Sequence, residues 1–329
     1  MNVKLQILVP HYTEKKEVIK PLLDSIQIQQ GIDLDNDIGV IIVNDGLDEI
    51  LDTEFLDNYT FPIEYHIHEH KGVSATRNAC LDYATADYVM FCDADDMFFN
   101  ACGLWIILRE AEKGFDTMVS VFVEEQLVDG KKYYINHERD STFVHGKVHN
   151  RKFLLDNNIR WNDSLTIHED SYFNILCQTL SGKDRGIYAQ SPFYLWKWRD
   201  ASVCRHDDKY LLKTYNNLLD SNKALVKEFL SRGMDDKAKH FIGLMVFEAY
   251  YTMNKPEWIN QENKEYRDSV EKHFTEYFAE MKVLWESIPD TQKMQISNAV
   301  RYRNVNEGMQ MEHITIDDWL KERETTAGA

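Results

Sequence analysis

Short apolar runs alternate with amphipathic segments through the first third of the chain. Four of the apolar runs have the length and residue content of strands, and three amphipathic segments between or after them show helical spacing. The predicted strands are 5–10, 40–45, 63–68 and 88–93, and the predicted helices are 14–30, 73–84 and 101–113. This alternation predicts an α/β fold with a mostly parallel sheet and helices on both faces.

The rest of the chain divides into a mixed part and a helical part. The mixed part is predicted to complete the same sheet with strands 115–123 and 190–198 and helices 150–157 and 169–181. From residue 207 onward the apolar spacing is that of long amphipathic helices. We therefore predict an α/β domain over residues 1–206, followed by a helical C-terminal region over 207–329.

Polar residues follow three of the most apolar predicted strands. These strand ends read Pro10-His11-Tyr12, Asn44-Asp45-Gly46 and Asp93-Ala94-Asp95-Asp96. In open α/β sheets, ligands bind in the crevice outside the carboxyl ends of the strands. We expect these three segments to converge on one binding site.

The acidic strand ends allow two interpretations each. Asp93, Asp95 and Asp96 are oxygen donors of the type that Mg²⁺ or Mn²⁺ prefers, or they form a solvated acidic turn before a helix. Asp45 precedes Gly46, which is typical of a turn, and a carboxylate at this position also suits hydrogen bonds from a nucleobase or ribose.

Two helix starts carry further candidate residues. Lys71 precedes a helix that contains Arg77, an arrangement that suits an anion such as a diphosphate; the alternative is an ordinary helix start with Arg77 in solvent. Thr166 and Glu169 have the spacing of a capping box, which explains Glu169 structurally. Asp170 has no such explanation. In a first helical turn the dipole would hold it ionised, either as dipole complementarity alone or as a proton acceptor.

The segment 194–208 alternates aromatic and basic residues. On a strand, Trp196 and Trp198 would share one face, as a stacking platform for a sugar or as packing against the sheet, with Arg199 on the other face. His206 is either a metal ligand beside Asp95 or an exposed side chain.

Charge and cysteine content exclude several classes of protein. Lys and Arg total 37 against 55 for Asp and Glu, and this net charge of -18 disfavours nucleic-acid partners and anionic membrane surfaces. The five cysteines are odd in number and form no C-x-x-C pair, which disfavours a disulfide framework or a zinc site. No apolar run reaches the length of a transmembrane segment. We expect a cytoplasmic protein without a cleaved signal.

Taken in order, the motifs of residues 3–205 resemble those of the family 2 glycosyltransferases, which have the GT-A fold. The segments that carry the resemblance are "PHY", "VNDG", "KGVSATRN", "FCDADD", "HGKVHNRKFLLDNNIRW" and "HEDSYFN". The chain departs from the family pattern at Asn44, where an aspartate is usual, and lacks the second glycine before the Ala-Arg-Asn block. The resemblance implies a nucleotide-sugar half over about 1–115 and an acceptor half over about 116–206.

The resemblance also implies roles for single residues. The nucleotide is expected to contact Pro10, Tyr12, Asp45, Lys71, Arg77, Asp93 and Arg199. The metal is expected on Asp95, with Asp93 and His206 as further ligands. Asp170 matches the aspartate of the family's Glu-Asp motif and is the expected catalytic base.

These roles together predict an inverting, metal-dependent glycosyltransferase. The expected donor is a nucleotide diphosphate sugar, with a UDP-sugar first, the expected cofactor is Mn²⁺ or Mg²⁺, and the expected acceptor is a hydroxyl group, with a glycan as the default. Two alternatives remain open: a nucleotidyltransferase that forms the sugar nucleotide, and an inactive protein that binds it. The helical C-terminal region is predicted to bind the acceptor or to form a homo-oligomer.

Overall fold

The computed structural model describes residues 3–46, 51, 53–199, 210–255, 258, 264–306 and 315–327. The chain separates into two compact units, Met1–Val203 and Cys204–Ala329. The predicted boundary near residue 206 lies outside the described residues.

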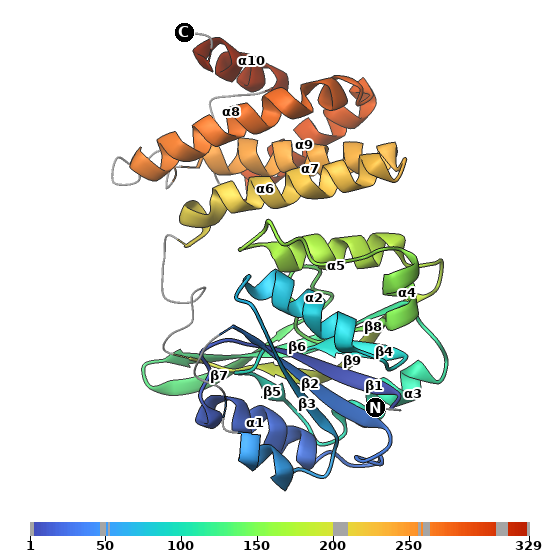
Figure 1. The fold of residues 1–329 in the computed structure, drawn as a ribbon. Coiled ribbons are helices and arrows are strands. Elements are labelled where there is room, and N and C mark those ends of the chain that lie inside the picture. Colours follow the sequence, from blue (N-terminus) through green and yellow to red (C-terminus); the bar gives the residue numbers. More distant parts are fainter. Residues whose placement is uncertain are drawn as a thin grey trace. The chain divides into compact units, whose positions relative to one another are not determined.

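The first unit is a mixed sheet with helices on both faces (Figure 1). Its strands are β1 (Leu5–His11), β2 (Ile38–Asp45), β3 (Ile63–His68), β4 (Tyr88–Phe91), β5 (Met97–Phe98), β6 (Thr117–Val128), β7 (Lys131–His137), β8 (Lys147–Asn150) and β9 (Gly186–Trp196). Its helices are α1 (Lys16–Gln27), the 3₁₀ helix η1 (Thr53–Asn58), α2 (Val73–Tyr83), α3 (Gly103–Ala111), α4 (Arg151–Asp156) and α5 (Glu169–Leu180). All strands and helices predicted from the sequence in this unit are present. The prediction missed the 3₁₀ helix η1 and the short or polar strands β5, β7 and β8.

The sheet order is β3-β2-β1-β4-β8-β6-β9-β5, and β7 pairs with β6. The four strands at one end, β3, β2, β1 and β4, are parallel to one another, as predicted. Strand β8 runs antiparallel to both of its neighbours, β4 and β6. Because β1, β2 and β4 are parallel, their carboxyl ends meet at one edge of the sheet.

Burial explains why the parallel strands form. Every residue of β2 is buried, as expected for a strand covered on both faces by helices. Helix α1 lies on one side of the sheet, and α2 and α5 lie on the other (Figure 1). On the α1 side, Ile19, Leu22, Leu23 and Ile26 repeat at helical spacing and pack into a core with alternate residues of β1 and β2.

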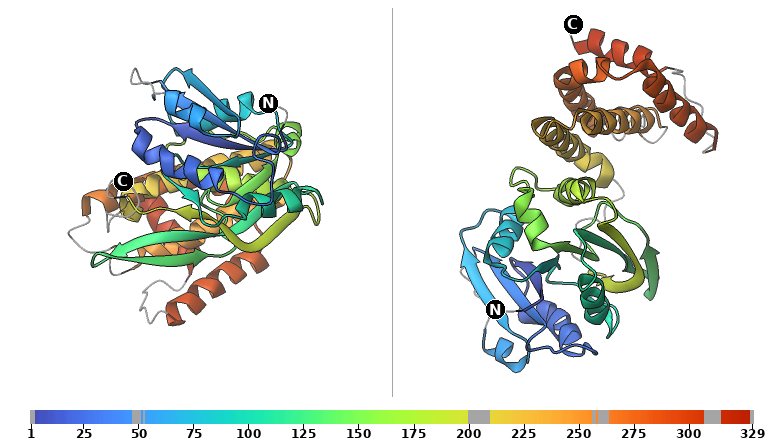
Figure 2. Two further views of the ribbon diagram at one scale, coloured as in Figure 1. Left: turned by 90° about the horizontal axis from the view of Figure 1, so that it is seen from below. Right: turned by 90° about the vertical axis from the view of Figure 1, so that its right-hand side faces the viewer.

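The β6–β7 hairpin extends beyond the neighbouring strands (Figures 1 and 2). Most of β7 is exposed, including Tyr133 at 51% and Tyr134 at 54%. The side chain of Glu125 on β6 accepts hydrogen bonds from Lys132 and Tyr134 across the two strands. These cross-strand polar contacts stabilise the exposed part of the hairpin, whereas most of β6 is buried.

The described part of the second unit is helical, as predicted. Its helices are α6 (Tyr210–Ser231), α7 (Asp235–Met253), α8 (Lys264–Glu286), α9 (Asp290–Asn306) and α10 (Ile316–Ala327). Trp319 of α10 is fully buried and packs against Tyr250 of α7 and Phe274 of α8. An aromatic core thus joins three of these helices.

Candidate active site

A cleft of about 380 Å³ lies at the carboxyl ends of β1, β2 and β4. The residues that line it come mainly from the three strand ends that the sequence analysis expected to converge. Six of the predicted site residues are among them: Pro10, Tyr12, Asp45, Arg77, Asp93 and Asp95. Parallel pairing places these segments together, because β1 is the direct neighbour of both β2 and β4.

Asp45 stabilises one wall of the cleft through hydrogen bonds. Its buried carboxylate accepts hydrogen bonds from the backbone N–H groups of Lys71, at 2.9 Å, and Gly72, at 3.0 Å. Gly46 follows with φ of 77°, and a Cβ atom there would lie 2.3 Å from the backbone nitrogen of His70. Asp45 is therefore both a turn residue and a cleft residue, so the two interpretations of it are compatible.

The mouth of the cleft has an aromatic surface. Tyr12 is 42% exposed, and its ring stacks on that of His70 with the centroids 5.0 Å apart. Lys71 contributes its backbone N–H to Asp45, whereas its ammonium group lies 3.4 Å from the exposed carboxylate of Glu69. Its predicted contact with a nucleotide stays a prediction.

Arg77 is buried, so the interpretation that it lies in solvent is wrong. Its guanidinium group from α2 binds three carboxylates: Asp93 at 3.0 Å, Glu169 at 3.0 Å and Asp170 at 2.8 Å. The ring of Trp161 lies 4.4 Å from the guanidinium carbon. Burial opposes the charge, but the three carboxylates outweigh it and raise the pKa of Arg77 further. One cation therefore links the acidic turn after β4 to the start of α5.

The three aspartates after β4 have different surroundings. Asp93 binds Arg77, and Asp95 lies 2.6 Å from the guanidinium group of Arg199. Asp96 is buried and accepts hydrogen bonds from the Tyr194 hydroxyl, at 2.5 Å, and from the Lys197 backbone N–H, at 3.0 Å. Burial and the neighbouring Asp95 and Asp93 raise the pKa of Asp96 well above its usual range.

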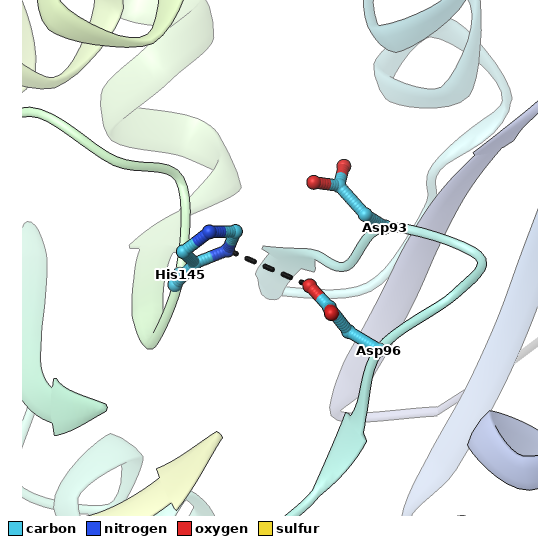
Figure 3. Close-up of side chains that lie close together, drawn as sticks. All are labelled: Asp93, Asp96 and His145. Atoms are coloured by element: carbon cyan, nitrogen blue, oxygen red, sulfur yellow. Dashed lines mark ion pairs between the residues drawn. The ribbon is translucent and has the colours of Figure 1, made fainter. Parts of the chain in front are cut away.

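Asp96 also faces a histidine that the sequence analysis did not single out. Nδ1 of His145 lies 3.7 Å from Asp96, and the two side chains point toward each other (Figure 3). Among the described residues, Asp93, Asp96 and His145 form a set whose ligand atoms all lie within 4.8 Å of one another. Two carboxylates and an imidazole are an acceptable donor set for a divalent metal.

Asp170 contacts a different guanidinium nitrogen of Arg77 from the one that contacts Asp93. Its Oδ1 accepts from Arg77 and its Oδ2 accepts from the Val144 backbone N–H at 3.1 Å, while 21% of the side chain stays exposed. Burial raises the pKa of Asp170 to about 8; Arg77 opposes this shift, and Glu169 and Asp93 add to it. Burial thus opposes the ionised form that the helix dipole was expected to favour, and the ionisation of Asp170 at neutral pH stays a prediction.

The predicted capping box at the start of α5 is also wrong. The residue before the helix is His168, in the left-handed conformation with φ of 64° and without a side-chain cap. Glu169 is the first helical residue, and its carboxylate binds Arg77 instead of a backbone N–H near Thr166. Both acidic residues of this first turn are thus bound to the same guanidinium group.

The tryptophans of the 194–208 segment do not share a strand face. Strand β9 ends at Trp196, so Trp198 lies beyond it. Trp196 packs on the rings of Phe143 and His145, which favours the packing interpretation over a sugar platform for this residue. His206 lies outside the described residues, so its role as a metal ligand stays a prediction.

Sequence analysis also gave no role to the residues around β8, although they belong to one of the quoted motifs. His145, Lys147 and His149 are all buried. Their spacing at alternate positions was an available signal: Lys147 and His149 share one face of β8, and His145 lies just before the strand. Whether that face was buried depended on β8 lying between β4 and β6.

The sequence model of glycosyl transferase family 2 matches residues 6–174. The chain therefore belongs to this family, and by sequence and fold it is a family 2 glycosyltransferase, as the motifs predicted.

One curated relative and several solved structures are similar to this chain. The minor teichoic acid biosynthesis protein GgaB of Bacillus subtilis (strain 168) is 24% identical over 282 residues, which is 78% of this chain. The chain spans only 29% of the length of GgaB. The crystal structure of S. aureus TarS 1–349 in complex with UDP-GlcNAc is 15% identical with a TM-score of 0.65, covering 99% of this chain and 92% of that chain.

A longer TarS structure from S. aureus has a TM-score of 0.62 at 14% identity and covers 92% of this chain and 54% of that chain. These structural likenesses establish the GT-A fold. Among the described residues, no helix is both long and apolar enough to cross a membrane.

Proposed function

We propose that this chain transfers a sugar from a nucleotide diphosphate sugar to an acceptor hydroxyl, with inversion at the anomeric carbon. The observation that carries the proposal is the position of Arg77 between Asp93, in the cleft at the strand ends, and Asp170, at the start of α5. Donor-binding groups and a candidate base thus lie on either side of one guanidinium group. The complexes of TarS with UDP and UDP-GlcNAc make a UDP-sugar the first donor to test.

The cleft would take the donor with its base at the aromatic mouth. Tyr12 and Asp45 suit the nucleobase, and Pro10 lies beside them. Asp93 suits the ribose, and Arg199, which lies 2.6 Å from Asp95, suits the diphosphate. These assignments follow the family resemblance, and the cleft supports them by bringing the side chains together.

Asp170 would act as the general base. The acceptor oxygen attacks the anomeric carbon as the bond from that carbon to the diphosphate oxygen breaks, and the hydroxyl proton passes to Asp170. The electron pair of the broken bond leaves with the nucleoside diphosphate. Attack from the face opposite the leaving group gives inversion, so the chemistry needs one base and no covalent intermediate.

The carboxylates of Asp93 and Asp95 fit a divalent cation. Both line the cleft, and their side chains keep 31% and 28% of their surface exposed, so oxygen atoms are accessible to a ligand there. Mn²⁺ or Mg²⁺ bound here would supply positive charge for the departing diphosphate. We favour this pair over the set with Asp96 and His145, because Asp96 is buried and already accepts two hydrogen bonds.

Thermal unfolding with Mn²⁺ and UDP separates the two metal sites. We expect the ligands to raise the Tm of the wild type, and Asp95→Ala to remove the rise, because a ligand stabilises only the state that binds it. Asp57→Ala changes an exposed carboxylate on η1 and serves as the control. A normal rise in Asp95→Ala together with none in His145→Gln would assign the metal to the buried set instead.

For the acceptor, we propose a hydroxyl-bearing polymer bound by the half of the domain over about 116–206. The name of GgaB, a minor teichoic acid biosynthesis protein, makes a teichoic acid the first acceptor to test beside simple glycans. We propose that the helical region over 207–329 binds part of the acceptor or a second copy of the chain.

The experiment that tests this function is a donor screen. Purified protein with Mn²⁺ is given each common UDP-, GDP- or TDP-sugar, with and without acceptor polymer, and release of nucleoside diphosphate is measured. Release from one donor that increases with acceptor supports the proposal. Release of pyrophosphate from a nucleoside triphosphate and a sugar phosphate would identify a nucleotidyltransferase, and nucleotide binding without any turnover would identify an inactive binding protein.

A further inference from the structure

A buried lysine lies close to the candidate base. Lys147, the first residue of β8, is 1% exposed, and its Nζ lies 3.2 Å from the Asp140 carboxylate. The same ammonium group donates a hydrogen bond to the backbone carbonyl of Phe143. A buried charge is costly unless it is paired, so a lysine in this position needs both contacts.

The contacts of Lys147 hold a short segment in a fixed conformation. Asp140 accepts hydrogen bonds from the backbone N–H groups of Thr142, at 3.0 Å, and Phe143, at 2.8 Å. From the other side, the buried amide of Asn174 donates to the carbonyls of Thr142, at 2.9 Å, and Phe143, at 2.8 Å. Lys147, Asp140 and Asn174 therefore brace residues 142–145, which we call the base-side loop.

Val144 of the base-side loop contacts the candidate base, Asp170. The Val144 N–H donates to Oδ2 of Asp170, and Arg77 donates to Oδ1, so both carboxylate oxygens are held from different directions. Asn174 follows Asp170 by one helical turn in α5. One helix therefore carries both the carboxylate and one of the groups that brace the loop against it.

We propose that Lys147, with Asn174 as its partner, is a positioning residue that holds the base-side loop so that Val144 orients the Asp170 carboxylate toward the acceptor hydroxyl. This proposal rests on the proposed function of Asp170 as the base. A general base must lie within hydrogen-bond reach of the proton it takes, and a displacement of about 1 Å can cost roughly 10²-fold in rate. Loss of the brace should therefore lower turnover without removing the base.

Four charged groups face Asp170. They are Arg77 from α2, Glu169 from α5, Asp93 from the turn after β4, and Lys147 from β8. Arg77 and Lys147 favour the ionised carboxylate, whereas Glu169 and Asp93 favour the protonated one. Replacing Lys147 by a neutral residue removes favourable charge as well as the brace, whereas replacing Asn174 removes only part of the brace.

The test compares Lys147→Met with Asn174→Ala, with Lys152→Met, at an exposed lysine of α4, as the matched control. We expect both brace variants to lower kcat by roughly 10- to 100-fold, with little change in UDP affinity or in KM for the donor. The acidic limb of the profile of kcat/KM against pH should move to higher pH in Lys147→Met and stay near its wild-type position in Asn174→Ala. A purely structural role would not separate the two variants in this way.

Folded protein is confirmed first from the Tm of each variant, and Asn174→Ala keeps the proposal testable if Lys147→Met does not fold. Wild-type kcat in a folded brace variant would overturn the proposal, as would an equal loss of UDP affinity and kcat. Asp170→Asn is measured in the same series. Full activity of Asp170→Asn would overturn the base assignment itself, whereas its inactivity beside active brace variants would overturn only the positioning role.

Discussion

The cleft at the strand ends and the base-side loop hold their candidate functional groups in different ways. In the cleft, Tyr12, Asp45 and Asp95 lie at or shortly after the ends of three neighbouring parallel strands, and the strand order alone brings them together. Around Asp170, the groups come from α2, α5 and the loop before β8 and meet through hydrogen bonds between residues far apart in the sequence. The candidate donor-binding groups are thus placed by the sheet, whereas the candidate base depends on a network of tertiary contacts.

Arg77 contacts both regions, so variants can be chosen that change one region, the other region, or the residue that links them. It contacts Asp93 on the cleft side and Asp170 on the base side. If the two regions differ in this way, substitutions in the cleft should affect donor binding and substitutions around Asp170 should affect turnover. A substitution of Arg77 should affect both.

The largest effect on turnover is expected from Asp170→Asn. The amide cannot accept the acceptor's proton, so kcat should fall by about 10²- to 10⁴-fold, while UDP binding in the cleft persists. Transfer is measured by product formation and binding by calorimetry, with Asp57→Asn as the control. Parallel loss of UDP affinity would show that the two regions are not separable.

Arg77→Met should produce the largest loss of stability. The variant leaves three carboxylates without the buried guanidinium group that binds them, and removal of one partner of a buried ion pair costs about 3–5 kcal/mol. Urea unfolding measures the free energy, and Arg109→Met, at an exposed arginine of α3, should change it little. Wild-type stability of Arg77→Met would contradict the inference that Arg77 links the acidic turn after β4 to the start of α5.

The pH dependence of kcat/KM and of stability should also report on the ionisation of Asp170. Because the pKa of Asp170 is raised to about 8, kcat/KM should fall as the pH drops below about 8, where the carboxyl is protonated and cannot accept a proton. The raised pKa also means that the stability gained from the protonated form is fully present below pH 3.8 and is lost as the pH rises through 8. Unfolding of the wild type and of Asp170→Asn across this range measures that loss. A profile without an acidic limb near 8 would contradict the assignment.

The smallest effect is expected at the mouth of the cleft. Tyr12→Ala removes an exposed ring that is proposed to contact the nucleobase, and an aromatic pair contributes about 0.5–1.5 kcal/mol. The Kd for UDP should therefore rise about 2- to 13-fold, with kcat at saturating donor unchanged. Tyr133→Ala on the β6–β7 hairpin is the matched control. A fall in kcat without a change in the Kd for UDP would contradict the proposed role of Tyr12 in donor binding.

Much of the donor side could be predicted from the sequence because it follows from local patterns. The alternation of apolar runs and amphipathic segments predicted β1 to β4 and α1 to α3, and parallel strands must bring their carboxyl ends to one edge. The positions of Asp45, Asp93 and Asp95 in the cleft follow from that rule alone.

The base side was decided by the tertiary structure. Whether Arg77 is exposed, whether Glu169 caps a helix, and whether Asp170 is ionised all depend on which side chains pack against them from more than 90 residues away. The sequence determined which residues carry charge and where strands end. Only the insertion of β8 between β4 and β6, and the packing of α5 against α2 through Arg77, fixed which charges are buried, because burial is a property of the assembled chain.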